Sequence, residues 1–257
     1  MARIHPTAVV DPGAKLADDV ELGPYCVIGG DVELGRGVVL GSHVVVVGRT
    51  SIGARSRIHP FAVIGEAPQV QGAGAPTQLC IGEDNLIREF CSIHAGSPGG
   101  DGSTRIGAGN FLLNNVHVAH DCRIGDHCVV ASLSALAGHV VVEDFAVVGA
   151  MVGVHQFCRI GEHSFTGAGT KLSRDVLPFS RVAGERARFI GVNGVGLKRR
   201  GFAPGKVAEL KHVFHLLFHS KLRRAAALER IAREHPGSPE VERLLRFVDG
   251  SRRGITR

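Results

Sequence analysis

Aliphatic side chains recur at every sixth position along most of the first two thirds of the chain. Every sixth residue from Ile4 to Ile64 is Ile, Leu or Val, and the phase resumes from Ile81 to Ile93 and from Ile106 to Leu172, with Thr166 as the one exception. A period of six fits neither the 3.6-residue period of an α-helix nor the two-residue alternation of a long strand. It predicts short strands and turns that follow one another around the flat faces of a narrow prism.

Three such units form one coil of 18 residues, and successive coils would stack like strands in a parallel sheet, about 4.8 Å apart. The fold class expected is mainly β, a parallel β-helix built from hexapeptide repeats. The residue after each aliphatic is often Gly, which suits tight turns, and the residue four positions after it is usually small. This small slot holds five of the six cysteines (Cys26, Cys91, Cys122, Cys128 and Cys158).

Two interruptions of the repeat, at residues 66–80 and 95–105, are rich in Gly, Pro and Ser and predict loops that leave the prism. The repeat ends near Val176, so we expect a β-helix domain at residues 1–180 and a second domain at residues 181–257.

The second domain is expected to be helical. Apolar stripes run from Val207 to Phe218 and from Leu222 to Ile231, and Ser238 followed by Pro239 reads as the N-cap and first turn of a third helix. Its charge also differs from that of the prism. Residues 1–180 hold 12 Lys and Arg against 17 Asp and Glu, whereas residues 181–257 hold 18 against 7.

The basic second domain indicates an anionic partner, but no nucleic-acid-binding motif accompanies it, so nucleic acid is not expected. No stretch approaches the roughly 18 uninterrupted apolar residues of a membrane span, and the N-terminus lacks the apolar core of a signal peptide. The cysteines show neither a Cys-x-x-Cys pair nor zinc-like spacing, which fits a reducing compartment. A cytoplasmic protein without an integral membrane segment is therefore expected.

The fourteen histidines include a group that the 18-residue coil would bring together. His139 follows His120 by one coil plus one residue, and His155 follows it by two coils less one, so the three should lie along one edge of the prism. Asp121 adjoins His120. A neutral histidine oriented by a carboxylate can act as a general base near pH 7. Histidines on a β-helix can also bind zinc, as in the β-helical carbonic anhydrases, but their ligand spacing is absent here, and we expect no metal.

Four further motifs, with the prism and the helical tail, give the chain a specific resemblance. They are His-Val-Ala-His-Asp-Cys at 117–122, Ala-Gly-His-Val at 137–140, Val-His-Gln-Phe-Cys at 154–158 and Gly-Leu-Lys-Arg-Arg-Gly-Phe at 196–202. In this order they resemble the UDP-N-acetylglucosamine acyltransferase family, over essentially the whole chain. The resemblance implies a left-handed helix sense, a homotrimer with sites between adjacent prisms, and acyl transfer to the 3-hydroxyl of UDP-GlcNAc in lipid A synthesis.

The same resemblance implies roles for individual residues. His120 would be the general base, Asp121 would fix its tautomer, and the backbone N–H of Gly138 would stabilise the oxyanion. The donor would be a (3R)-hydroxyacyl chain on acyl carrier protein, carried by phosphopantetheine, so no separate cofactor is expected. Substrate contacts would come from His117, His139, His155, Gln156, Asn193, Arg199 and Arg200, and acyl length would be measured near Phe165, Ala168 and Lys171.

Two departures from the family pattern concern the side of the site that would hold the nucleotide sugar. The first loop lacks the expected Asp, Lys and Tyr between Pro68 and Thr77, and Val195 replaces an acidic residue. Three hypotheses therefore stay open. They are O-acylation of UDP-GlcNAc, N-acylation of a 3-amino analogue of that sugar, and a non-catalytic relative that binds acyl carrier protein or a nucleotide sugar.

Overall fold

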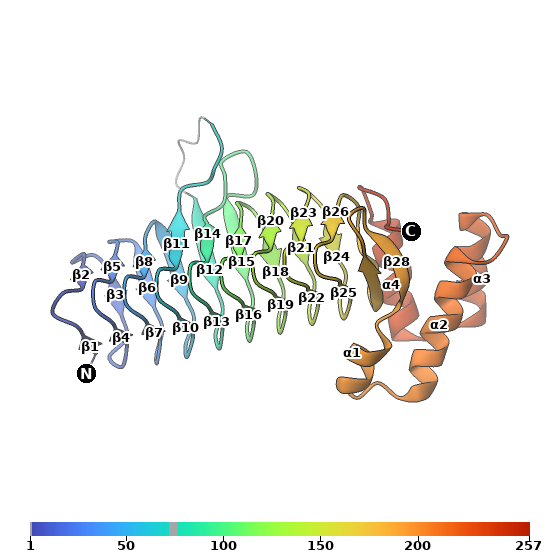
Figure 1. Ribbon diagram of the computed structural model, residues 1–257, viewed down its shortest axis with the longest axis horizontal. Helices are drawn as coiled ribbons and strands as arrows, with labels where there is room; N and C mark the ends of the chain where they lie inside the picture. The colour runs from blue at the N-terminus through green and yellow to red at the C-terminus, as the bar shows by residue number, and fades with distance from the viewer. Residues whose placement is uncertain (1, 72–76) are drawn as a thin grey trace.

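The computed structural model describes residues 2–71 and 77–257, and it is an elongated prism with a helical part at one end (Figure 1). Three sheets form its faces, and their strands are parallel except for the last pair of the first sheet, β27 and β28. The first contains β1 (Arg3–Ile4), β4 (Glu21–Leu22), β7 (Val39–Leu40), β10 (Arg57–Ile58), β13 (Leu86–Ile87), β16 (Phe111–Leu112), β19 (Val129–Val130), β22 (Val147–Val148), β25 (Phe165–Thr166), β27 (Ser180–Ala183) and β28 (Arg188–Val192).

The other two faces are built in the same way. The second sheet contains β2 (Val9–Val10), β5 (Val27–Ile28), β8 (Val45–Val46), β11 (Val63–Glu66), β14 (Ser92–His94), β17 (His117–Val118), β20 (Ala135–Leu136), β23 (Gly153–Val154) and β26 (Lys171–Leu172). The third contains β3 (Lys15–Leu16), β6 (Val32–Leu34), β9 (Arg49–Ile52), β12 (Gln78–Ile81), β15 (Ser103–Ile106), β18 (Arg123–Ile124), β21 (Val141–Val142) and β24 (Arg159–Ile160).

Strand pairing has the register that the six-residue period predicts. Val130 pairs with Val148, and Ile124 pairs with Val142, in both cases 18 residues further along the chain. The aliphatic residues of the repeat fill the interior, where Val130 and Leu136 have no exposed surface. The prediction of a parallel β-helix followed by a helical part is confirmed.

The cysteines in the small slot are buried in the prism, as the repeat predicts. Burial raises the pKa of the Cys122 and Cys128 thiols to about 12, so both stay protonated and unreactive at neutral pH. Cys80, outside the slot, is half-buried.

Two longer connections leave the prism on the same side, between β11 and β12 and between β14 and β15 (Figure 1). They fall within the segments 66–80 and 95–105 in which the repeat is interrupted. Residues 72–76 of the first segment lie outside the described residues.

The chain after the last coil contains more regular structure than its pattern predicts. β27 and β28 form an antiparallel hairpin at the end of the first sheet, so the expected boundary at residue 180 falls at the first residue of β27. The helices that follow are α1 (Gly194–Arg199), α2 (Pro204–Phe218), α3 (Arg224–Glu234) and α4 (Pro239–Asp249). None of the helices in the described ranges is long and apolar enough to span a membrane.

The helical part has its own apolar core, which includes Phe179, Leu210, Phe214 and Leu244. The expected start of α4 is correct, but the Ser238 side chain does not cap it. Its hydroxyl instead donates a hydrogen bond to Glu209 of α2.

Aromatic side chains stack along the corner between the third and first sheets. The rings of His127, Phe145 and His163 follow one another at centroid distances of 5.1 and 4.7 Å, and Phe179 continues the column at 5.9 Å from His163. Each of these residues has a positive φ, between 54° and 63°, because it forms the tight turn at its corner. Burial, with Arg200 and Arg243 nearby, lowers the pKa of His163 from 6.5 to about 4.

His163 is therefore expected to make stability depend on pH. Its folded-state pKa lies below that of the unfolded chain, so its contribution is complete above about pH 6.5 and is lost as the pH falls toward 4. We expect His163→Phe, which continues the aromatic column without a titrating group, to reduce the loss of unfolding free energy between pH 7 and pH 4.5. Urea unfolding of both proteins at the two pH values measures this, and an equal loss in both would contradict it.

Candidate active site

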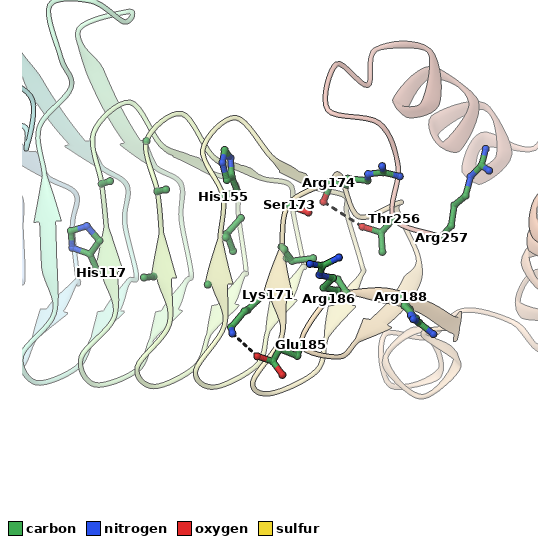
Figure 2. A pocket seen from close by; sticks show the side chains of 18 of the residues that line it. His117, His155, Lys171, Ser173, Arg174, Glu185, Arg186, Arg188, Thr256 and Arg257 are labelled. Carbon is green, nitrogen blue, oxygen red and sulfur yellow. Dashed lines mark hydrogen bonds and ion pairs between the residues drawn. The ribbon is translucent and has the colours of Figure 1, made fainter.

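A cavity of about 1400 Å³ lies along the second sheet and the corner that follows it, in the C-terminal half of the prism (Figure 2). Strand register determines its floor. His117 pairs with Ala135, Ala135 with Gly153, and Gly153 with Lys171. Two small residues therefore separate a histidine at one end from a lysine at the other. They leave a trough along the face of the prism.

His120 lies in the wall of this trough and is held by Asp121. Its Nδ1 lies 2.8 Å from Oδ2 of Asp121, and because an ionised carboxylate only accepts hydrogen bonds, Nδ1 carries the proton. Nε2 is then left with its lone pair, which is the tautomer that a general base requires.

Asp121 is itself fixed from the second long loop. Ser97 donates its backbone N–H to Oδ1 at 3.1 Å and its hydroxyl to Oδ2 at 2.6 Å. Burial alone would raise the pKa of Asp121, but the hydrogen bonds from Ser97 and His120 outweigh it and the pKa is lowered. The side chain is only 1% exposed, so a buried carboxylate that stays ionised holds the His120 ring in place.

Gly138 lies directly beneath the His120 ring, one coil further along. A Cβ built on Gly138 would come within 2.5 Å of Cε1 and 2.7 Å of Nε2 of His120. The Gly138 N–H donates to no acceptor among the residues that the structure describes. A free N–H beside an unprotonated imidazole nitrogen is the arrangement that stabilises the oxyanion formed in acyl transfer.

The other predicted histidines gather at the same corner. The rings of His139 and His120 meet edge to face at 5.2 Å, and Nε2 of His139 lies 3.7 Å from Asp121. His155 lines the cavity, and its Nδ1 donates to the carbonyl of Gln156, which is exposed beside it.

His117 stands at the N-terminal end of the trough. Its Nδ1 lies 2.9 Å from the Ser92 hydroxyl, and burial together with neighbouring His94 lowers the pKa of His117. It is therefore neutral at pH 7 and can exchange hydrogen bonds with a ligand in the trough. Sequence reasoning did not single out His94, a buried histidine that the second sheet places beside it.

The far end of the cavity is strongly cationic. Its lining there includes Lys171, Arg174, Arg186, Arg188 and Arg257, with Glu185 paired to Lys171 at 2.6 Å (Figure 2). Apart from Lys171, these residues were not predicted from the sequence. Arg174 follows Leu172, the last aliphatic of the repeat, and the hairpin and the C-terminal segment that carry Arg186, Arg188 and Arg257 follow no repeat. The only available signal was the charge excess of the tail.

The remaining predicted residues lie elsewhere in this chain. Asn193 is buried and caps α1, accepting the Gly196 N–H and donating to the His163 carbonyl. The Arg200 guanidinium covers the Phe145 ring at 4.4 Å, on the corner between the third and first sheets, and Arg199 is exposed beside it.

Of the three residues expected to measure acyl length, Lys171 alone lines the cavity. Phe165 belongs to β25 of the first sheet, and Ala168 lies between β25 and β26. Val195, the departure in α1, is 61% exposed near Asn193 rather than beside His120.

His120, Asp121 and His139 place three possible metal-binding atoms within 4.8 Å of one another. The carboxylate, however, accepts hydrogen bonds from Ser97 as well as from His120. Both of its oxygens accept hydrogen bonds from Ser97, and the side chain is only 1% exposed, so an incoming ion would have to displace buried contacts. The geometry therefore favours proton transfer over metal binding at this position.

Comparison with known proteins defines the class first. Residues 31–66 and 103–138 match the bacterial transferase hexapeptide model, so the prism is that of a hexapeptide-repeat transferase. Residues 175–256 match the model described as UDP N-acetylglucosamine O-acyltransferase, domain 2.

Relatives that align over the whole chain narrow the class. The acyl-[acyl-carrier-protein]--UDP-N-acetylglucosamine O-acyltransferases of Alkalilimnicola ehrlichii and Halorhodospira halophila are 48% and 46% identical, over 100% of both chains. The solved structure of LpxA from Acinetobacter baumannii superimposes with a TM-score of 0.96 at 41% identity, covering 99% of each chain. UDP-N-acetylglucosamine O-acyltransferase (LpxA) from Moraxella catarrhalis gives 0.95 at 39%, again over 99% of each. The chain belongs to the UDP-N-acetylglucosamine O-acyltransferase family.

Proposed function

We propose that this chain transfers a (3R)-hydroxyacyl group from acyl carrier protein to the 3-hydroxyl of UDP-GlcNAc, in the lipid A pathway of the cytoplasm. The observation that carries the proposal is the His120–Asp121 pair above the free N–H of Gly138, at the wall of an open trough. Family membership supplies the substrates, because the relatives are named for both the carrier-protein donor and the sugar acceptor.

The reaction follows from this geometry. Nε2 of His120 accepts the proton of the sugar hydroxyl while its oxygen bonds to the thioester carbonyl carbon. The carbonyl oxygen becomes an oxyanion and accepts the Gly138 N–H. The C–S bond then breaks, and the protonated His120 returns its proton to the departing phosphopantetheine sulfur. Asp121 stays ionised and stabilises the imidazolium between the two proton transfers.

The neighbouring groups would orient the substrates. His117, His139, His155 and Gln156 would contact the sugar nucleotide or the acyl chain, which would run along the floor between Ala135 and Gly153. A role of Phe165, Ala168 and Lys171 in acyl length stays a prediction. The excess of positive charge after residue 180 supports docking of an acidic carrier protein, a contact that added salt would weaken.

The distance between the two groups of predicted residues supports a homotrimer. His120 lies at the corner after the second sheet, whereas Asn193, Arg199 and Arg200 lie at the corner after the third. The cavity beside His120 is lined by none of Asn193, Arg199 and Arg200. In a cyclic trimer the first corner of one prism can face the second corner of its neighbour, so that the arginines of a second copy complete the site.

Competition between two acceptors tests the proposed reaction. The enzyme is given equal UDP-GlcNAc and its 3-amino analogue, with a ladder of (3R)-hydroxyacyl carrier-protein donors, and the products are weighed by mass spectrometry. We expect the ester of UDP-GlcNAc to dominate. Dominance of the amide would favour the N-acyltransferase hypothesis that the altered first loop and Val195 left open. Binding without any product would indicate a non-catalytic relative.

Removal of the Arg200 guanidinium is expected to weaken sugar-nucleotide binding more than chemistry. Arg200→Ala should raise KM for UDP-GlcNAc by about 10- to 100-fold with a smaller change in kcat, because a charge-assisted bond to phosphate contributes to ground-state binding. The KM of Arg200→Lys should fall between those of the unaltered chain and Arg200→Ala. Arg57→Ala, which removes an exposed arginine of the first sheet, serves as the matched control. A KM unchanged in Arg200→Ala would contradict the assignment.

A further inference from the structure

A second cluster of histidine and carboxylate groups lies in the helical part, far from His120 along the chain. His212 projects from α2 toward the C-terminal end of α3, where Glu234 is the last helical residue and His235 follows it. Nε2 of His212 lies 3.0 Å from Oε2 of Glu234, and the rings of His212 and His235 are 5.5 Å apart. One possible ligand atom from each of the three residues lies within 4.8 Å of the others.

His235 is oriented as a metal-binding histidine usually is. Its Nδ1 lies 3.2 Å from Oε1 of Glu209, so Nδ1 carries the proton and Nε2 keeps its lone pair. This Nε2 is buried and has no hydrogen-bond partner among the residues that the structure describes. A buried nitrogen without a partner is costly. A histidine that binds metal through one ring nitrogen usually donates the N–H of the other to a carboxylate or a carbonyl.

We propose that His212, Glu234 and His235 bind one divalent transition metal ion, with Zn²⁺ as the best fit. Two imidazole nitrogens and one carboxylate oxygen are a ligand set that suits zinc, with water in the fourth position. Zinc bonds of 2.0–2.1 Å place tetrahedral ligand atoms about 3.3 Å apart. The 3.0 Å separation of His212 and Glu234 is therefore already close to what the ion needs. The proton that Nε2 of His212 donates to Glu234 would move to Nδ1 or be released when the ion binds. Arg230 contacts the other carboxylate oxygen and leaves Oε2 for the metal.

Such an ion would cross-link α3, a helix with few buried side chains, to the rest of the helical part. Only Ala227 and Ile231 of this helix are buried, and its first turn has no side-chain cap. The metal would join its C-terminal end to the middle of α2. Glu209 would extend the connection to Ser238 at the start of α4. This cluster was not predicted from the sequence, because it depends on a contact between helices that residue spacing does not reveal.

Titration of the full-length, metal-stripped protein with Zn²⁺ tests the site, read by calorimetry and by thermal unfolding. We expect His212→Ala and Glu234→Gln to reduce the stoichiometry by one equivalent relative to the unaltered chain. We also expect Zn²⁺ to raise the Tm of the unaltered chain by about 3 °C or more, and to lose this effect in both variants. Both side chains are partly exposed, 47% for His212 and 31% for Glu234, so the variants should fold.

The matched control is His219→Ala, which removes another histidine of the same region and should leave zinc binding unchanged. Any Zn²⁺ bound at His120, Asp121 and His139 would be the same in all three variants, so it would not change the difference in stoichiometry between them. The proposal is overturned if His212→Ala and Glu234→Gln bind as much Zn²⁺ as the unaltered chain. It is also overturned if His219→Ala loses the same equivalent, because general binding to surface histidines would then explain the result.

Discussion

Replacing His120 by Ala is expected to lower kcat for acyl transfer by roughly 10²- to 10⁴-fold, the usual contribution of a positioned general base. The side chain is 17% exposed and its main contact is the hydrogen bond to Asp121, so the prism should keep its fold. The KM values should change little, since the hydroxyl proton is transferred only in the transition state. Steady-state rates with saturating acyl carrier protein and UDP-GlcNAc measure the effect.

The control for this variant is His59→Ala. His59 is also a partly exposed histidine of the prism, 3.5 Å from the Glu89 carboxylate, but it lies outside the cavity lining. Its removal should leave the rate unchanged. A near-normal kcat in His120→Ala would show that another group accepts the proton.

Gly138→Ala is expected to have the second largest effect, a loss of about 10²-fold in kcat. The new Cβ would lie 2.5 Å from Cε1 of His120, a distance that forces the ring to move. The methyl group would also crowd the N–H that stabilises the oxyanion. The three atoms nearest to the methyl group all belong to the His120 ring, which is partly exposed and can shift, so the thermal stability should change little. Rates and Tm measured side by side separate the loss of catalysis from loss of fold.

Gly205→Ala provides the control for a glycine substitution, because a Cβ there meets nothing within 4 Å. It should retain full activity. If Gly138→Ala also retains it, the His120 ring does not lie where the structure places it during the reaction, or the Gly138 N–H has no role.

The six-residue period predicted the prism because one interaction repeats in every coil. Outside the two insertions, each interior aliphatic packs above the one 18 residues earlier, so spacing alone determines the register, as for Val130 and Val148. The hairpin of β27 and β28 has no such repeat. Its position depends on pairing with the last strand of the first sheet, which the local sequence does not encode.

The meeting of His120 and His139 at one corner was predictable for the same reason, and the residues around them were not. His120 and His139 meet because their separation is close to one coil. Ser97 holds Asp121 from a loop 24 residues upstream, at a spacing that the coil does not generate. Arg186 and Arg188 reach the cavity from the hairpin. The repeat therefore predicts where the residues of the prism lie. It does not predict where the residues of the loops and the hairpin lie.

Division of the site between two chains is tested most directly by mixing two variants that are each slow at low UDP-GlcNAc. His120→Ala and Arg200→Ala are unfolded together, refolded as mixed trimers and assayed at low UDP-GlcNAc, where both variants alone are slow. Random mixing gives about a quarter of the sites an intact His120 facing an intact Arg200 of the neighbour. We predict recovery of activity toward that fraction of the unaltered enzyme. Activity no greater than the average of the two variants would contradict a site shared between chains.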